Sequence, residues 1–147
     1  MTISIDTNIF VYLADGRDPK KQSIARDIVA RAPSVGARVA LQVVGEINSA
    51  LCKRLRRTPW EAAQVARNVM TAFETFAYDE RCVSQALAEA AAGRWSYWDA
   101  VLVFAAGQAG CTALLTEDMQ HGGRLGAVEI VNPFGPNGLT DRARELL

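Results

Sequence analysis

The chain has 147 residues, the length of one domain; half of its residues are apolar and 22% are charged, as in folded soluble proteins. Sixteen basic residues balance sixteen acidic ones, so the overall charge neither favours nor excludes a nucleic-acid partner. The three cysteines form no CxxC pair, which argues against a disulfide framework and a cysteine zinc site. No apolar stretch is long enough to cross a bilayer and the start lacks a leader pattern, so we expect a cytoplasmic protein without a membrane partner.

The first half of the sequence alternates short apolar runs with segments of helical spacing. Asp18 and Pro19 are typical of a helix start, with aspartate as the cap and proline at the first helical position. Apolar residues recur at helical spacing from Val43 to Leu55. The expected elements are a strand at 3–5, a helix at 8–15, a helix at 19–32, a strand at 38–42 and a helix at 43–55.

The second half continues this alternation. Thr58, Pro59 and Glu61 match a capping box at the start of a helix. The segment that opens at Ser96 is apolar nearly all round, which indicates a buried helix. The expected elements are a helix at 59–71, a strand at 73–78, helices at 80–93 and 97–107, and strands at 111–115 and 128–131. Residues 1–147 are expected to form a single domain, with 135–147 as a loosely held tail.

Strands that alternate with helices predict an α/β fold, a parallel sheet covered by helices on both faces. Ligands of such sheets gather at the carboxyl ends of the strands, where the strand order reverses. Asp6 follows the strand at 3–5, and Asp118 follows the strand at 111–115. If these strands are neighbours, the two carboxylates converge at one edge of the sheet.

Two further acids have settings that fit the same edge. Glu46 lies one turn into a helix beside the apolar residues Val43 and Ile47, so we expect it to flank the buried stripe and to need a partner. No lysine or arginine stands one turn away from it. Asp99 lies at the head of the most apolar helix, and helix heads that follow strands point toward the carboxyl edge. Four acids can therefore be placed around one cleft.

Each acid also has a purely structural interpretation. Asp6 and Asp118 could cap the helices expected after them, since aspartate is common at that position. Asp99 stands three residues after Ser96, which resembles a capping box with aspartate in place of glutamate. Taken together the acids are more informative, because crowded carboxylates raise one another's pKa unless a cation is bound. Oxygen ligands without histidine or cysteine suit Mg²⁺ or Mn²⁺, and such a site supports phosphodiester hydrolysis.

These pieces resemble the PIN-domain ribonucleases, and among them the VapC-type toxins of bacterial toxin–antitoxin pairs. The matching segments are IDTNIF, VVGEI, SYWDA and LLTEDMQHG followed by IVNPF, in an order that covers nearly the whole chain. The resemblance implies a three-layer α/β/α domain with a parallel sheet of about five strands. It implies that Asp6, Glu46, Asp99 and Asp118 are catalytic acids that bind the metal, and that Asn8 and Thr116 support them. It also implies an Mg²⁺- or Mn²⁺-dependent endoribonuclease that forms a homodimer and is inhibited by a cognate antitoxin protein.

Two other clusters have two interpretations each. The basic run of Lys53, Arg54, Arg56 and Arg57 could contact an RNA backbone, or could be a solvated helix end where cations favour the dipole. Trp95, Tyr97 and Trp98 could stack on an unpaired base, but at the head of a buried helix we expect them to be packing residues.

Three functional classes can be compared on this sequence. The first is the metal-dependent endoribonuclease. The second is a catalytically silent PIN-fold module that binds RNA or protein, and the four intact acids count against it. The third is another Mg²⁺-dependent phosphotransfer fold. A haloacid-dehalogenase-like enzyme needs a second aspartate two residues after Asp6, where Asn8 stands, and a receiver domain needs adjacent acids that are missing.

Overall fold

The strands form where short runs of aliphatic residues become fully buried. In the computed structural model, which describes residues 1–147, Ile3 and Ile5 of the first strand have no exposed surface. The strands are β1 (Thr2–Ile5), β2 (Arg38–Ala40), β3 (Glu74–Phe76), β4 (Cys111–Leu115), β5 (Arg124–Leu125), β6 (Val128–Val131), β7 (Phe134–Gly135) and β8 (Gly138–Leu139). The helices are α1 (Thr7–Ala14), α2 (Pro19–Arg31), α3 (Leu41–Lys53), α4 (Pro59–Ala72), α5 (Glu80–Ala91), α6 (Tyr97–Gln108) and α7 (Asp141–Leu146), with a 3₁₀ turn η1 (Ala32–Val35).

The main sheet has the strand order β3-β2-β1-β4-β6-β5. The first five strands in this order pair in parallel, which confirms the predicted sheet. The short strand β5 is an addition that runs antiparallel to β6, with Leu125 opposite Val128. Gly126 has a φ of 58°, a conformation that glycine adopts readily, and this permits the sharp reversal between the two strands. Two residues have no recognisable period, so the sequence indicated only a loop here.

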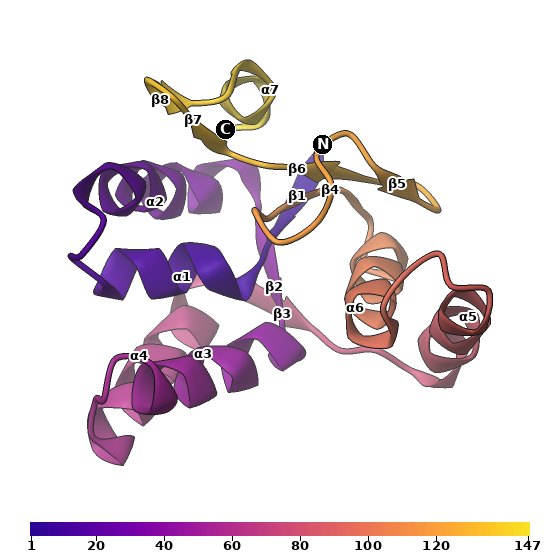
Figure 1. Cartoon of the computed structure of the whole chain (residues 1–147), viewed down its shortest axis with the longest axis horizontal. Helices are drawn as coiled ribbons and strands as arrows, with labels where there is room; N and C mark the ends of the chain where they lie inside the picture. Colours follow the sequence, from indigo (N-terminus) through magenta and orange to yellow (C-terminus); the bar gives the residue numbers. More distant parts are fainter.

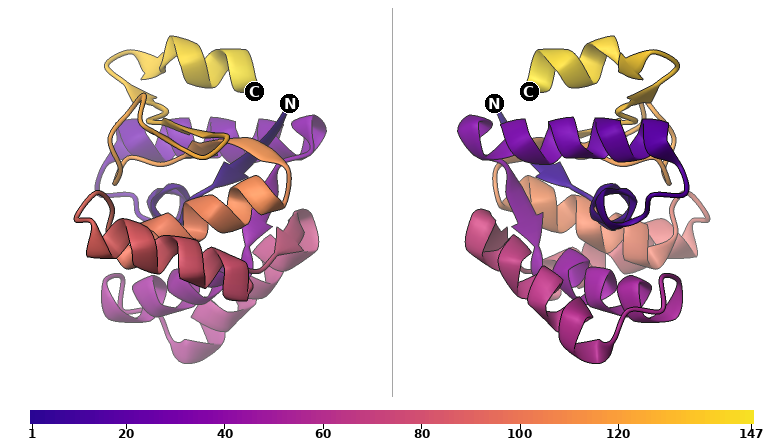
Figure 2. Two further views of the ribbon diagram at one scale, coloured as in Figure 1. Left: turned by 90° about the vertical axis from the view of Figure 1, so that its right-hand side faces the viewer. Right: turned by 90° about the vertical axis from the view of Figure 1, so that its left-hand side faces the viewer.

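The helices cover both faces of the sheet and make three layers (Figure 1). Helices α1 to α4 lie on one face, and α5 and α6 lie on the other, as the two side views also show (Figure 2). This division follows from the strand order. The chain moves from β1 outward to β3 and then crosses back to β4, so right-handed crossovers place the later helices on the opposite face. None of the helices combines the length and apolarity that a membrane span needs.

Local signals set most helix starts as expected. Thr58 and Glu61 form the full capping box of α4, in which each side chain accepts from the other's backbone N–H. Asp79 caps α5 and Ser96 caps α6. Helix α3 begins at Leu41, two residues earlier than predicted, because β2 ends at Ala40 and the chain turns at once into the helix. The predicted apolar helix is confirmed in α6, where Ala100 and Val101 are fully buried.

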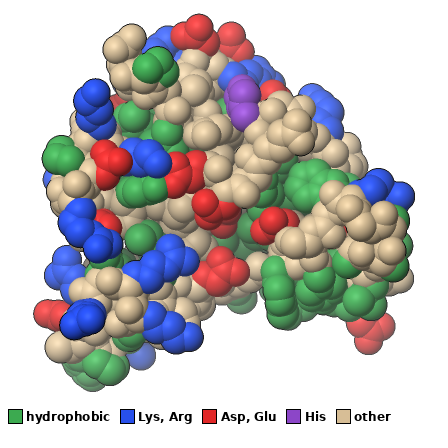
Figure 3. Space-filling model, in the orientation of Figure 1, with side chains coloured by type: hydrophobic (Ala, Val, Ile, Leu, Met, Phe, Trp, Pro, Cys, Tyr) green, Lys and Arg blue, Asp and Glu red, His purple; other side chains and the backbone are tan.

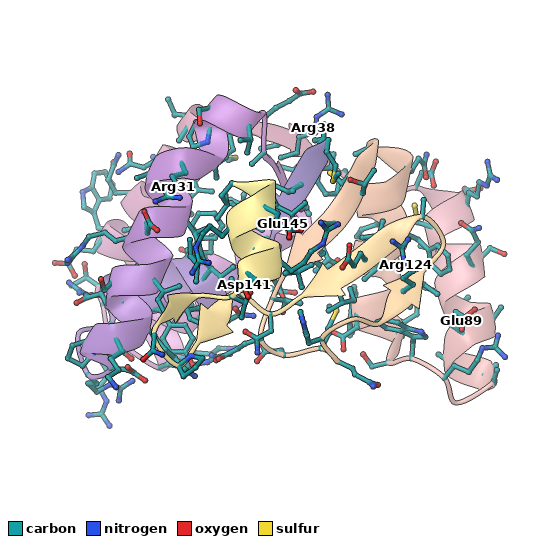
Figure 4. The ribbon with its side chains drawn as sticks, turned by 90° about the horizontal axis from the view of Figure 1, so that it is seen from above. Arg31, Arg38, Glu89, Arg124, Asp141 and Glu145 are labelled. Atoms are coloured by element: carbon teal, nitrogen blue, oxygen red, sulfur yellow. The ribbon has the colours of Figure 1, made fainter.

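The C-terminal residues, for which the sequence predicts loose attachment, contribute to the core. Leu139, Ala143 and Leu146 are buried in the same hydrophobic cluster as the sheet strands. Arg142 of α7 makes an ion pair with Glu129 of β6 at 2.8 Å. Figure 4, seen from above with Asp141 and Glu145 labelled on α7, shows this helix on top of the molecule, over the region between α2 and the strands. The segment after the glycine- and proline-rich turn is too short to show an apolar period, so its packing could not be predicted from the sequence pattern.

The strand order reverses between β1 and β4. Strand β1 pairs with β2 on one side and with β4 on the other. From β1 the chain adds β2 and β3 toward one edge of the sheet, and from β4 it adds β6 and β5 toward the other edge. The register places Ile5 beside Leu115, so the residues that follow these two strands emerge next to each other. This is the position at which open α/β sheets bind ligands.

Candidate active site

The centre of the site is the pair Asp6 and Thr116 at the ends of β1 and β4. The backbone N–H of Asp6 donates to the carbonyl of Leu115 at 3.0 Å, which extends the β1–β4 ladder by one residue. The Thr116 hydroxyl donates to the Asp6 carboxylate at 2.7 Å. Asp6 also caps α1, where its other oxygen accepts from the N–H of Thr7 at 2.7 Å. The structural interpretation of Asp6 as a helix cap is therefore correct, and it coexists with a place in the cleft.

Asn8 connects the two sides of this centre. Its amide nitrogen lies 3.0 Å from the Thr116 hydroxyl and 3.1 Å from the Asp118 carboxylate, and 3.4 Å from Asp6. Its two amide protons therefore serve the two nearer acceptors. The Thr116 hydroxyl also accepts from the backbone N–H of Asp118 at 3.1 Å. Asn8 and Thr116 are both buried, so they hold Asp6 and Asp118 in place from beneath.

Burial raises the pKa of Asp6 from 3.8 to about 6. Desolvation of the carboxylate is the main cause, and the negative charges of Glu46 and Asp118 raise the pKa further. The hydrogen bonds from Thr116 and Thr7 act in the opposite direction, because they stabilise the charged form. Asp6 is only 6% exposed and makes no ion pair, so its charge is not compensated by a cation within the protein.

Glu46 reaches the same cleft from α3. Its carboxylate accepts from the Thr7 hydroxyl at 2.6 Å and from the Gln42 amide at 3.0 Å. The sequence correctly indicated that Glu46 needs a partner, but it missed these two, because Thr7 lies 39 residues away and Gln42 was assigned to a strand. Glu46 flanks the buried stripe of α3, as predicted, but its own side chain is solvated. The residue is exposed at the cleft, beside the buried Val43 and Ile47.

Asp99 and Asp118 complete the acidic lining. Asp118 lies in the turn after β4 and no helix begins there, so the helix-cap interpretation of Asp118 is wrong. Ser96 caps the N–H of Asp99 at 3.3 Å, but the reciprocal bond of a capping box is missing, which leaves the Asp99 carboxylate free. All four acids line one open cavity of about 320 Å³. It is lined by Asp6, Thr7, Asn8, Gln42, Glu46, Ser49, Ala50, Lys53, Arg54, Asp99, Leu102 and Asp118.

The acidic cleft carries charge that the protein does not neutralise. None of the nine ion pairs in the structure involves an acid of the cleft. Figure 3 shows acidic side chains gathered at the hollow between α3 and α6, with basic side chains concentrated on the side of α3 and α4. Lys53 and Arg54, both exposed, are the two cations that line the cavity.

The donor set fits a hard divalent cation. Carboxylate, amide and hydroxyl oxygens are the ligands of Mg²⁺ and Mn²⁺, and the cleft offers no thiol or imidazole. No three acidic, histidine or cysteine side chains lie close enough together to enclose an ion directly. Mg²⁺ keeps several waters and binds through one or two carboxylates, so an open arrangement of this kind is compatible with it.

A second set of contacts, which the sequence did not indicate, anchors the loop that carries Asp118. Glu117 points away from the cleft, where it accepts from Lys21 at 2.7 Å and from the Tyr12 hydroxyl. The Lys21 ammonium lies 4.8 Å from the centre of the Tyr12 ring and 5.6 Å from that of Phe134. These contacts join the loop to α1, α2 and the C-terminal hairpin.

The residues of the basic run line two different cavities, and the aromatic residues near Asp99 are partly packed and partly exposed. Lys53 and Arg54 face the acidic cavity, whereas Arg54, Arg56 and Arg57 line a neighbouring one. Trp95 and Tyr97 pack against the core, as expected. Trp98 does not, because 58% of its surface is exposed.

The parallel sheet with helices on both faces makes the chain an α/β protein, and the acidic cleft at the point where the strand order reverses is its candidate cation site. The family model of the PIN domain matches residues 3–121, and the chain belongs to this family. No curated protein is similar enough in sequence to count as a match.

Solved structures share the fold at low sequence identity. VapC20 of Mycobacterium tuberculosis, a toxin that cleaves the sarcin–ricin loop, is 20% identical with a TM-score of 0.61 over 76% of this chain and 86% of its own. A chain of a toxin–antitoxin complex from Klebsiella pneumoniae is 18% identical with a TM-score of 0.63, over 90% of this chain and 98% of its own. VapBC2 from Rickettsia felis, bound to a DNA fragment of its promoter, is 12% identical with a TM-score of 0.61, over 88% of this chain and 97% of its own. These identities establish the fold alone.

Proposed function

We propose that the protein is a divalent-metal-dependent endoribonuclease and the toxin of a toxin–antitoxin pair. The observation that carries the proposal is the convergence of Asp6, Glu46, Asp99 and Asp118 on one cavity without a compensating ion pair. Membership of the PIN family and the likeness to structures described as VapC toxins and toxin–antitoxin complexes support it. A module that only binds RNA has no need of an uncompensated anionic cleft, because such a cleft repels phosphate.

In this proposal the residues that bind the cation differ from those that act on the water molecules. A bound Mg²⁺ or Mn²⁺ supplies polarisation of a phosphate oxygen and a lowered pKa for a water molecule. Asp6 and Asp118 would hold the cation, fixed from beneath by Thr116 and Asn8. Glu46, oriented by Thr7 and Gln42, and the free carboxylate of Asp99 would bind the waters around it or accept the proton of the attacking water.

The partners of the proposed toxin follow from the same features. Single-stranded or looped RNA is the proposed substrate, since the cleft is open and lined by polar side chains. A cognate antitoxin protein would inhibit the enzyme most directly by placing a cation against the four acids, none of which has an ion-pair partner in the protein. Homodimerisation and a cytoplasmic location remain predictions.

The test is cleavage of an RNA mixture containing tRNA and ribosomal RNA, in Mg²⁺ or Mn²⁺ and in EDTA. We expect cleavage by the parent only with metal, and none by Asp6→Asn, Glu46→Gln, Asp99→Asn or Asp118→Asn. Glu80→Gln is the matched control, because Glu80 is an exposed acid on α5 without a side-chain partner. Equal cleavage in EDTA and in metal, or full activity of the four variants, would overturn the proposal.

A further inference from the structure

The turn between α3 and α4 places several unpaired cations next to the acidic cleft. Lys53, Arg54, Arg56 and Arg57 are exposed, and none of them takes part in an ion pair, in contrast to Arg31, Arg38, Arg94, Arg124, Arg142 and Arg144. Leu55, between them, packs against the core and fixes the turn to the body of the protein. These cations are therefore held in place by the fold and are available to an outside anion.

A second cavity lies beside the acidic one. It is formed by the end of α1, the loop before α2 and the turn after α3, and is lined by Ala14, Asp15, Gly16, Arg17, Arg54, Leu55, Arg56 and Arg57. Four of these residues are arginines and one is an acid, Asp15, which already pairs with Arg17 at 2.8 Å. Arg54 lines both cavities, so the basic cavity is a neighbour of the acidic cleft at the C-terminal end of α3.

The backbone of the turn gives an independent reason to look for a ligand here. Arg56 has a φ of 51° and is the only residue other than glycine with a positive φ. Glycine or asparagine normally takes such a position at a helix end, because a Cβ is disfavoured there. The turn is closed by a hydrogen bond from the N–H of Arg57 to the carbonyl of Leu51 at 3.0 Å, and the Arg57 guanidinium donates to the carbonyl of Ala14 at 3.3 Å. An arginine held at a positive φ, among arginines without ion-pair partners, makes this turn a candidate ligand site.

We infer that the basic cavity binds the phosphate of a nucleotide adjacent to the one cleaved, so that the substrate is a single-stranded RNA segment running from the acidic cleft along α3. This inference rests on the proposed function. The two cavities share Arg54 but otherwise have different charged lining residues: the four acids line the first, and Arg17, Arg56 and Arg57 line the second. A phosphate in the basic cavity is therefore a different phosphate from the one held at the acids. The arginine forks suit phosphate geometry, and such contacts position the strand without reading its sequence.

The experiment measures binding of a fluorescent ten-nucleotide single-stranded RNA by anisotropy, in an Asp99→Asn background that does not cleave it, from 50 to 200 mM KCl. The variants are Arg54→Gln, Arg57→Gln and Arg56→Gly. The matched control is Arg26→Gln, since Arg26 is an exposed, unpaired arginine of α2 that lines none of these cavities. We expect each turn variant to weaken binding several-fold and to reduce the slope of log K against log salt by about 0.7, the value for one lost phosphate contact on a single strand. The control should match the parent.

Arg56→Gly separates charge from folding. It removes the charge and relieves the positive φ, so we expect an unchanged or higher melting temperature together with weaker RNA binding. A cleavage assay in the active background adds a length test. Arg57→Gln should raise KM for the ten-nucleotide RNA and leave a dinucleotide unaffected, because the dinucleotide does not reach the basic cavity.

The outcomes distinguish the two proposals. If the parent cleaves RNA but the three turn variants bind it with the slope and affinity of Arg26→Gln, the basic cavity is not a phosphate site and the proposed function stands. If the parent does not cleave or bind RNA at all, both proposals fail.

Discussion

Replacement of Asp6 by asparagine should stabilise the metal-free protein at neutral pH. Folding transfers this carboxyl group from water into a site where its pKa is about 6, compared with 3.8 without the protein environment. The folded state therefore binds the Asp6 proton more tightly than the unfolded state does. The contribution of Asp6 to the free energy of unfolding is greatest below pH 3.8 and is lost as the pH rises through 6.

The magnitude follows from the shift in pKa. A difference of about two pKa units corresponds to about 3 kcal/mol of unfolding free energy, which the parent loses as the pH rises from below 3.8 to above 6. Asparagine does not ionise and does not lose it. Asparagine keeps an oxygen for the N–H of Thr7, but its amide group disturbs the bonds with Thr116 and Asn8, which costs about 1–2 kcal/mol. The expected net gain for Asp6→Asn is about 1–2 kcal/mol at pH 7.5.

Urea unfolding in EDTA at pH 4, 5.5 and 7.5 measures this difference. Asp6→Asn should be less stable than the parent at pH 4 and more stable at pH 7.5, with the crossing near pH 5. Glu80→Gln, an exposed acid on α5, should show no such crossing. A loss of stability in Asp6→Asn that is the same at all three pH values would refute the reasoning, because the buried charge would then carry no cost.

Two further substitutions test the groups that hold the acids. Thr116→Val should lower stability by about 1–3 kcal/mol and abolish most RNA cleavage, because the buried Thr116 hydroxyl has three hydrogen-bond partners. Thr112→Val, at an exposed position of β4, should do neither. Equal losses in both variants would contradict this role of Thr116. Lys21→Met should lower kcat with little change in KM, because Lys21 anchors Glu117 beside the cleft, whereas Lys20→Met should behave as the parent in the same assay; a KM effect alone would speak against anchoring.

The parallel sheet and its active edge were predictable from local patterns. Buried runs end at Asp6 and Asp118, and parallel strands bring their carboxyl ends to one edge, so their convergence required only that β1 and β4 be neighbours. The cap at Thr58 was likewise visible in four adjacent residues. The family resemblance agreed with these local signals, and the match of the PIN model confirmed it.

Features that depend on distant contacts were not predictable in this way. The partner of Glu46 is a hydroxyl 39 residues away, and Glu117 meets Lys21 only because β4 and α2 are adjacent after folding. The packing of Leu146 against the core was missed because a short helix after a glycine-rich turn has too few residues to show a period. The exposure of Trp98 was missed for a related reason, since one residue of an apolar helix head can face outward without changing the pattern.

The most direct measurement of the central claim is Mn²⁺ binding, followed by the decrease of the free-ion signal in electron paramagnetic resonance. The parent and Glu80→Gln should bind the ion with equal affinity. Asp6→Asn and Asp118→Asn should bind it at least about tenfold more weakly, a change of about 1.4 kcal/mol. Equal Mn²⁺ affinity in the parent and Asp6→Asn, or no binding by the parent at millimolar Mn²⁺, would contradict the account of this cleft.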